Sequence, residues 1–181
     1  MYTRIKKIKN IEYVYLVKSY WSKRKKSPKQ KTLKYLGRLY RFKKTKNKAL
    51  EQYLNIKDIE NYFNKTSIKK IIKDLIKLEL HNYNFKEIKP NIWKQEDIIV
   101  DLKSKILYNS LNKKQACIEI NNNFLSNKTL RNIINLKFPP GLTNIQIGKY
   151  LANSFLSTGI VLSEDKFVIL SQRILKKINN I

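Results

Sequence analysis

Nine residues near the N-terminus, from Ser22 to Gln30, carry five cations and no acid. Clustered Lys and Arg side chains neutralise phosphates, and they are typical of a surface that binds nucleic acid. These charges repel one another and Pro28 cannot donate to a central strand ladder, so we expect an exposed tip. Eleven side chains in and after this tip are the predicted nucleic-acid contacts: Lys23, Arg24, Lys25, Lys26, Lys29, Lys31, Lys34, Arg38, Arg41, Lys43 and Lys44.

The charge of the whole chain is concentrated in its first quarter. The 181 residues include 39 Lys and Arg against 13 Asp and Glu, a net charge of +26. Residues 1–48 hold 18 of these cations and one acid, which gives them a net charge of +17. Such self-repulsion destabilises a compact state unless a polyanion offsets it. Abundant Lys, Ile and Asn are also typical of AT-rich coding, as in an AT-rich prokaryote or archaeon, but coding bias would spread the charge more evenly.

Three acidic residues form the one candidate for a metal-dependent nuclease site. Asp97, Asp101 and Glu119 fall in strand-like runs, and their spacing is similar to that of restriction-type nucleases. Such sites use a Lys two residues after the Glu to assist the metal-bound water, and here that residue is Asn121. Metal-dependent cleavage is therefore less favoured than DNA binding without catalysis or RNA binding, and we assign no catalytic or metal-binding residue.

The single cysteine and the single histidine do not indicate a catalytic or metal site. The single Cys117 and the single His81 exclude disulfide frameworks and zinc fingers on ligand number. Cys117 lies in an apolar run and is expected to be buried, and His81 is expected to meet the final carbonyls of a helix. There is no glycine-rich phosphate loop, so we expect no nucleotide cofactor. No apolar run is long enough for a membrane span, and we expect a cytoplasmic protein associated with nucleoid or ribosomes.

Three strand-like runs are expected to hold the basic tip. They are Met1 to Lys9, Tyr13 to Trp21 and Lys31 to Gly37, with a turn at Asn10. In the second run Tyr13, Tyr15 and Trp21 share one face and are expected to pack on the sheet, whereas Val14, Leu16, Lys18 and Tyr20 occupy the other. A small three-stranded antiparallel sheet over residues 1–48 is the predicted result.

Part of this region resembles a known family. The pattern Tyr-x-Tyr-Leu-Val-x-Ser-Tyr, a basic turn, and then Gln-Lys-Thr-Leu-Lys-Tyr-Leu-Gly-Arg-Leu covers Tyr13 to Leu39. It resembles the N-terminal segment of prokaryotic transposases of the IS4-like group. Those transposases continue into a long RNase H-like domain with three catalytic carboxylates, which this chain is too short to contain. The resemblance implies a DNA-handling module without the transposition chemistry.

Residues 49–84 are predicted to form a helical connector. Thr66 and Ser67 suit the start of a helix over Ile68 to Leu80, whose apolar stripe is opposed by lysines. We interpret this helix as packed on the core with a solvated lysine face; a DNA-reading helix is the alternative.

Residues 85–181 are predicted to form a mixed α+β domain, with a soft boundary between 81 and 90. Five short strands are expected between Phe85 and Asn121, and a hairpin is expected around Ser110 to Lys114. Three helices follow: Lys128 to Leu136, Asn144 to Thr158 and Glu164 to Ile178. The last two form a helical hairpin, favoured over a helix-turn-helix because the connection is long and Glu164 and Asp165 begin the second helix.

The predicted fold class is therefore α+β, and the predicted function is non-enzymatic DNA binding, for DNA organisation or transcription control. The main alternative is an RNA-binding, ribosome-associated protein, which exposed Tyr or Trp side chains stacking on unpaired bases would favour. A homodimer or a protein partner is expected to use the C-terminal domain, and a membrane-surface role is disfavoured.

Overall fold

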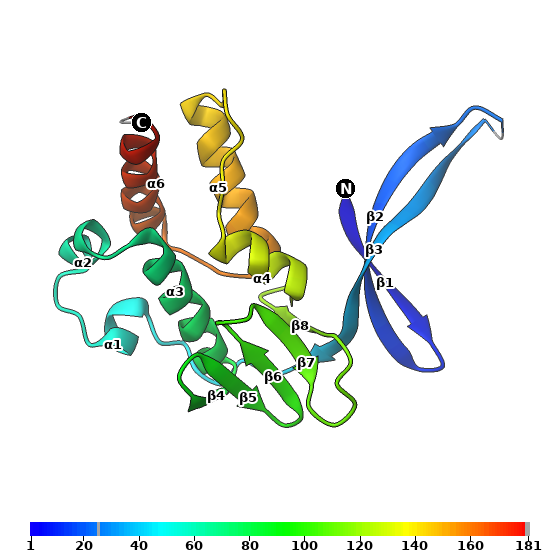
Figure 1. Ribbon diagram of the computed structural model, residues 1–181, viewed down its shortest axis with the longest axis horizontal. Coiled ribbons are helices and arrows are strands. Elements are labelled where there is room, and N and C mark those ends of the chain that lie inside the picture. Colours follow the sequence, from blue (N-terminus) through cyan, green and yellow to red (C-terminus); the bar gives the residue numbers. More distant parts are fainter. Residues whose placement is uncertain (25, 180–181) are drawn as a thin grey trace.

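The computed structural model describes residues 1–24 and 26–179 and is an α+β protein with six helices and two sheets in those residues (Figure 1). The first sheet has the order β1-β2-β3-β8-β9. Its strands are β1 (Tyr2–Ile8), β2 (Ile11–Ser22), β3 (Ser27–Arg41), β8 (Ala116–Ile120) and β9 (Asn123–Ser126).

The predicted three-stranded sheet is therefore only part of a larger one. β1, β2 and β3 form the expected antiparallel meander, but the end of β3 continues the sheet by pairing in parallel with β8. Arg38 lies opposite Ala116 and Arg41 lies opposite Glu119. Parallel pairing between segments so far apart in sequence has no local signal, and for that reason the sequence did not predict it.

The basic tip is shorter than predicted, because the two long strands extend into it. β3 begins at Ser27, and its register pairs Pro28 with Trp21 and Lys29 with Tyr20. Pro28 is tolerated because this ribbon end has only two strands, so its missing N–H leaves no central ladder bond unmade. Two register shifts in the β2–β3 pairing mark bulges, which increase the local twist.

A second, four-stranded antiparallel sheet follows the connector, with the order β4-β5-β6-β7. Its strands are β4 (Lys86–Lys89), β5 (Ile92–Gln95), β6 (Ile98–Asp101) and β7 (Ile106–Asn109). The predicted hairpin around Ser110 to Lys114 is reduced to a short turn, because β7 and β8 belong to different sheets. An isolated antiparallel bridge between Tyr108 and Gln115 and the hydrogen bond from the Asn109 N–H to the Lys114 carbonyl close this turn.

Local signals place the helices well. They are α1 (Leu50–Leu54), α2 (Ile59–Lys65), α3 (Ile68–Asn82), α4 (Asn127–Ile134), α5 (Asn144–Thr158) and α6 (Glu164–Asn179). Ser67, Ser126 and Thr143 accept backbone N–H bonds at the starts of α3, α4 and α5, as their side-chain chemistry predicts.

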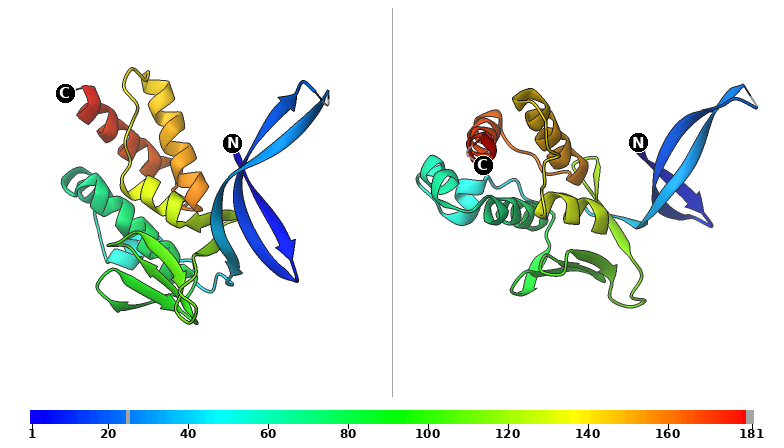
Figure 2. Two further views of the ribbon diagram at one scale, coloured as in Figure 1. Left: turned by 45° about the vertical axis from the view of Figure 1, so that its right-hand side comes forward. Right: turned by 45° about the horizontal axis from the view of Figure 1, so that its top comes forward.

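The main core joins the second sheet to all the long helices. α3 and α4 lie between the second sheet and the antiparallel hairpin of α5 and α6 (Figures 1 and 2). Ile72, Leu75 and Ile76 of α3 are almost completely buried in this core. Gly159 ends α5 with a φ of 75°, and any Cβ there would clash with the carbonyl of Ile120. The turn therefore requires glycine.

A smaller apolar cluster joins the N-terminal strands to β8. Val14, Leu36 and Leu39 pack with Cys117, whose side chain is fully buried as predicted. Burial raises the pKa of the Cys117 thiol far above its ordinary value, so the thiol is neutral and packs as a small apolar group.

Candidate nucleic-acid interface

The β2–β3 ribbon projects away from the rest of the protein (Figures 1 and 2). β1 begins at Tyr2, opposite Val17, so only two strands continue from there to the tip. β2 has 12 residues, a length of about 40 Å at the usual rise per residue. A ribbon of two strands is narrow enough to enter the major groove of DNA.

Lysines gather on one face of this ribbon. Lys18 lies directly opposite Lys31, and Lys29 lies opposite Tyr20 on the same face. Lys34 follows on that face, opposite Leu16. Like charges that face one another across strands destabilise a sheet, so the pair formed by Lys18 and Lys31 is unfavourable unless an anion lies between them.

The tip adds further cations to this lysine face. The side chains of Lys23, Arg24 and Lys26 are exposed in the loop between β2 and β3. Lys26 adopts a φ of 43°, the left-handed conformation that tight turns often need. Lys25, which was also predicted to contact phosphate, lies outside the described residues.

The opposite face is aromatic near the base of the ribbon. The Tyr35 ring lies 5.4 Å from that of Tyr15 and 6.2 Å from that of Tyr13. Lys6 sits over the Tyr15 ring at 4.9 Å. Burial raises the pKa of Tyr35 to about 12, so this hydroxyl stays protonated at neutral pH. Tyr13 and Tyr15 pack on the sheet as predicted, but Trp21 does not: its side chain is 64% exposed.

Two of the predicted contacts are engaged with carboxylates instead. Arg41 pairs with both Glu12 and Glu119, and the hydrogen bond to Glu12 is the main reason that its pKa lies above the ordinary value. Arg38 packs over the Tyr40 ring at 5.2 Å, near the body of the protein, whereas Lys43 is exposed in the connector. Arg41 therefore joins β2, β3 and β8, and its charge is paired with two carboxylates.

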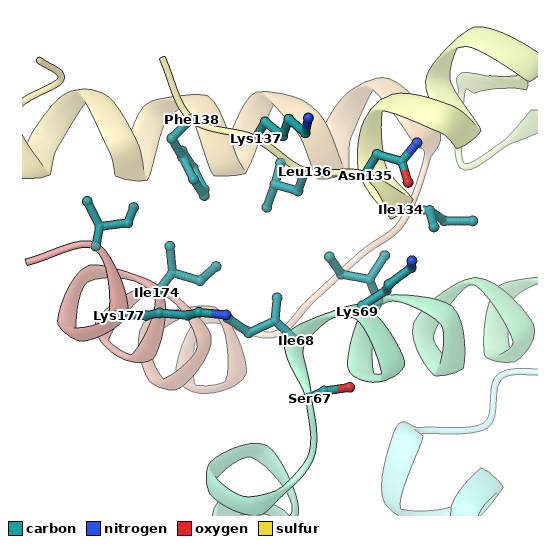
Figure 3. Close-up of a pocket in the computed structure, with 12 residues that line it drawn as sticks. Ser67, Ile68, Lys69, Ile134, Asn135, Leu136, Lys137, Phe138, Ile174 and Lys177 are labelled. Atoms are coloured by element: carbon teal, nitrogen blue, oxygen red, sulfur yellow. The ribbon is translucent and has the colours of Figure 1, made fainter. Parts of the chain in front are cut away.

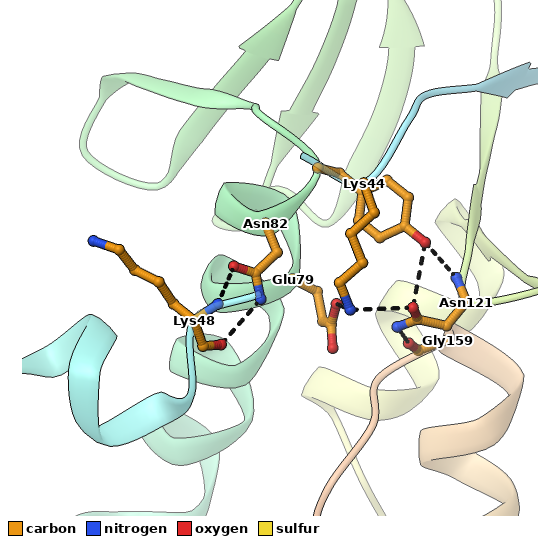
Figure 4. A network of polar contacts seen from close by, with 7 residues as sticks. Lys44, Lys48, Glu79, Asn82, Asn121 and Gly159 are labelled. Carbon is orange, nitrogen blue, oxygen red and sulfur yellow. Dashed lines mark hydrogen bonds and ion pairs between the residues drawn. The ribbon is translucent and has the colours of Figure 1, made fainter. Parts of the chain in front are cut away.

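Lys44 belongs to a polar network that joins the connector to α3 and to the turn after β8 (Figure 4). Its amine lies 3.7 Å from the buried Glu79 carboxylate and donates to Asn121 Oδ1 at 3.4 Å. Asn121 in turn donates from Nδ2 to the Gly159 carbonyl at 2.7 Å, and its backbone N–H donates to the Tyr83 hydroxyl. Lys44 thus anchors the connector to α3.

Asn82 makes a second anchor beside this network. Its side-chain amide accepts from the Lys48 N–H at 3.1 Å and donates to the Lys48 carbonyl at 3.2 Å (Figure 4). The segment that follows β3 is therefore tied to α3 at two points. These contacts attach the end of the ribbon to the helical part of the protein.

The three acids considered for a nuclease site do not share a sheet. Asp101 ends β6 and accepts backbone N–H bonds from Lys103 and Ser104, which stabilise its ionised form and lower its pKa. Asp97 precedes β6, whereas Glu119 lies in β8 and pairs with Arg41. Among the described residues, no group of three or more His, Cys, Asp or Glu side chains is placed to hold a metal ion.

A groove of about 690 Å³ lies between α3, α6 and the segment after α4 (Figure 3). Ile68, Phe138 and Ile174 contribute to its apolar walls, and Lys69, Lys137 and Lys177 also line it. It is remote from the ribbon in sequence and in the fold. In the part of the chain that the structure describes, no helix is both long enough and apolar enough to cross a membrane.

Sequence reasoning missed Lys18 and the exposure of Trp21. Strand alternation predicts the correct face for Lys18, beside Tyr20, but it does not predict which residue of β3 lies opposite. Only the register with β3 brings it opposite Lys31. Strand alternation separates the two faces of a strand, but it does not say which face another segment will cover.

Comparisons with family models, with curated proteins and with solved structures give no match for this chain. The resemblance of Tyr13 to Leu39 to IS4-like transposases stays a prediction. The candidate site is therefore defined by its own geometry: a protruding, two-stranded ribbon with a lysine face and a basic tip.

Proposed function

We propose that this protein is a non-enzymatic DNA-binding protein, and that its β2–β3 ribbon enters a groove of duplex DNA. Lys18, Lys29, Lys31 and Lys34 contact backbone phosphates from one face of the ribbon. Lys23, Arg24 and Lys26 do so from the tip. Arg41 and Lys44 are left out of this contact set because carboxylates already pair with them.

The observation that carries the proposal is the facing pair of Lys18 and Lys31. Uncompensated like charges in direct cross-strand register are a cost to the folded sheet. A phosphate between or beside the two amines removes this cost and adds two attractive contacts. The neighbouring Lys29 and Lys34 extend the same row along the ribbon, as a phosphate backbone in a groove requires.

Binding of the full chain to a duplex of about 25 base pairs, measured by fluorescence anisotropy over a series of salt concentrations, tests the proposal. A triple variant, Lys18→Gln, Lys29→Gln and Lys31→Gln, is expected to lose most of the affinity. Each phosphate contact contributes about 0.9 to the slope of log affinity against log salt, so the slope is expected to become shallower by about 3.

The matched control is the triple variant Lys69→Gln, Lys70→Gln and Lys73→Gln on α3. It removes the same number of charges from the helix that was the alternative DNA-reading element. It is expected to keep at least half of the affinity. An equal loss in both triple variants would show that net charge alone drives binding and would refute the ribbon site.

Binding to an RNA duplex of the same sequence, measured at the same salt concentration, distinguishes DNA binding from the main alternative, RNA binding. A clear preference for RNA would overturn the DNA assignment and favour ribosome association.

Incubation of both polymers with the protein and Mg²⁺ or Mn²⁺ is expected to leave them intact, and cleavage would contradict the non-enzymatic assignment. A homodimer or partner that uses residues 85–181 stays a prediction.

A further inference from the structure

The end of the ribbon carries an indole ring that the described part of the chain leaves mostly exposed. Trp21 is 64% exposed, whereas the second tryptophan, Trp93, is 3% exposed in the main core. Trp21 lies four residues beyond Val17, the last residue of β2 that pairs with β1, so no third strand of the described chain pairs with the ribbon at its level. Its cross-strand partner is Pro28, and the two rings lie on the same face of the ribbon.

The face beneath these two rings is held in place by polar contacts. Ser19 and Gln30 form the next pair of this face toward the body of the protein. Gln30 bonds to both Arg4 and Tyr2, and the Tyr2 hydroxyl lies 3.3 Å from Ser19 Oγ. β1 pairs with the ribbon up to Val17 and reaches Ser19 and Gln30 through these side chains, so Trp21 and Pro28 form the next pair beyond the part of the ribbon that β1 contacts.

Cations flank this apolar pair along the chain. Lys23, Arg24 and Lys26 occupy the adjacent loop, and Lys29 follows Pro28 on the other face. Such a charge arrangement complements a phosphate backbone and rules against an apolar protein partner or a second copy of this chain. Aromatic rings on a basic surface stack on bases, and apolar side chains that enter a groove insert between base steps.

We propose that Trp21, with Pro28 beside it, stacks on a base where the stacking of duplex DNA is interrupted, and that the ribbon therefore prefers DNA with a gap or a mismatched step. This inference rests on the proposed DNA binding and names its substrate class. A continuous duplex hides its base faces, so Trp21 gains the stacking contact only where a step is already open. The lysine face supplies affinity for any duplex, and Trp21 supplies the preference.

The test compares two labelled duplexes of one sequence, one continuous and one with a single-nucleotide gap, with the full-length protein. The wild type is expected to bind the gapped duplex about ten-fold more tightly, within the range measured for one base stacked on an aromatic ring. Its tryptophan emission is expected to fall on binding, and the remaining emission comes from the buried Trp93. Trp21→Ala is expected to bind both duplexes alike, with the affinity of the wild type for the continuous one.

Tyr20→Ala is the matched control, because Tyr20 is 47% exposed at the neighbouring position but lies on the lysine face. It is expected to keep the preference for the gapped duplex. If the wild type binds both duplexes equally and Trp21 emission does not change, the inference is wrong and DNA binding stands. An equal loss of preference in Tyr20→Ala refutes the assignment to the Trp21 face. If the wild type binds neither duplex, the proposed function itself fails.

Discussion

His81 is the single histidine of the chain, and its surroundings oppose its protonation. It lies in the last turn of α3, and the centre of its ring lies 5.3 Å from that of the tilted Tyr53 ring. Its Nε2 atom is buried without a hydrogen-bond partner in the described part of the chain. Burial, followed by the charges of Lys46 and Lys48, lowers the pKa of His81 below its ordinary value.

The stability of the protein is therefore expected to fall as the pH drops below about 6.5, the ordinary pKa of histidine. There the unfolded chain binds a proton that the folded His81 resists, and linkage converts this difference into lost stability. The free energy of unfolding in urea, measured at pH 7.5 and 5.5, is expected to fall in the wild type by more than it does in His81→Gln. The same pH dependence in both proteins would contradict this prediction.

Charged side chains near the ribbon base show how far residue type alone predicts a role. Arg41 and Lys44 are cations of the same basic region as the exposed lysines, and residue type alone does not distinguish them. Carboxylates of distant segments pair with both. Glu119 lies 78 residues from Arg41 in sequence. Whether a cation is free to bind a phosphate is thus decided by its fold neighbours, and at these two positions they are acids.

At the scale of the element, the ribbon has different chemistry on its two faces. Regular alternation in β2 places Lys18 and Tyr20 on one face and Ser19 and Trp21 on the other. Lys29 and Lys31 share the face of Lys18 through the regular pairing of this part of the ribbon, and the bulge between Leu16 and Val17 brings Lys34 onto that face as well. One bulge in β3 therefore extends the lysine face toward the body of the protein.

Removing one lysine of the facing pair is expected to affect stability and binding in opposite directions. Lys31→Gln relieves the repulsion with Lys18, which is worth about 0.2–1 kcal/mol in cross-strand pairs. Amide hydrogen exchange is expected to show greater protection of the ribbon strands in the free variant. Its affinity for duplex DNA is expected to fall, with a salt slope that is shallower by about 1.

Lys89→Gln provides the control for this change. Lys89 is an exposed strand lysine of β4, in the second sheet, and its loss removes the same charge. Neither ribbon protection nor the salt slope is expected to change in this variant. Reduced protection of the ribbon in Lys31→Gln would show that Lys18 and Lys31 do not repel each other in the free protein.

At the scale of the whole molecule, the ribbon and the body share one sheet. The end of β3 pairs with β8, and Cys117 closes the apolar cluster formed by Val14, Leu36 and Leu39. Gly37 lies at this junction with a φ of 135°, and a Cβ there would lie 2.6 Å from the Ala116 carbonyl carbon. The close approach of the two backbones requires the absence of a side chain.

Gly37→Ala is therefore expected to destabilise the protein by at least about 2 kcal/mol, through backbone strain and the contact with Ala116. Gly141→Ala is the control, because Gly141 also has a positive φ, of 77°, but has open space around it. This control is expected to cost only about 1 kcal/mol, the penalty for the left-handed conformation itself. Urea unfolding measures both, and equal losses would show that the junction is not tightly packed.

The sequence by itself determined the local structure of this protein. The period of the apolar residues, together with the cap at Ser67, placed the long helices, because helix formation depends on neighbours within a few residues. Alternation in β2 separated its two faces correctly. The same information also located the excess of positive charge in residues 1–48.

Only the tertiary structure decided which of these residues remain free. The parallel pairing of β3 with β8, the separation of β7 from β8 and the strand β9 depend on contacts between distant segments, for which a local pattern contains no signal. For the same reason the sequence did not distinguish Lys31, which faces another lysine, from Arg41, which two acids neutralise. It likewise did not show that Trp21 stays uncovered, because burial is a property of the assembled surface.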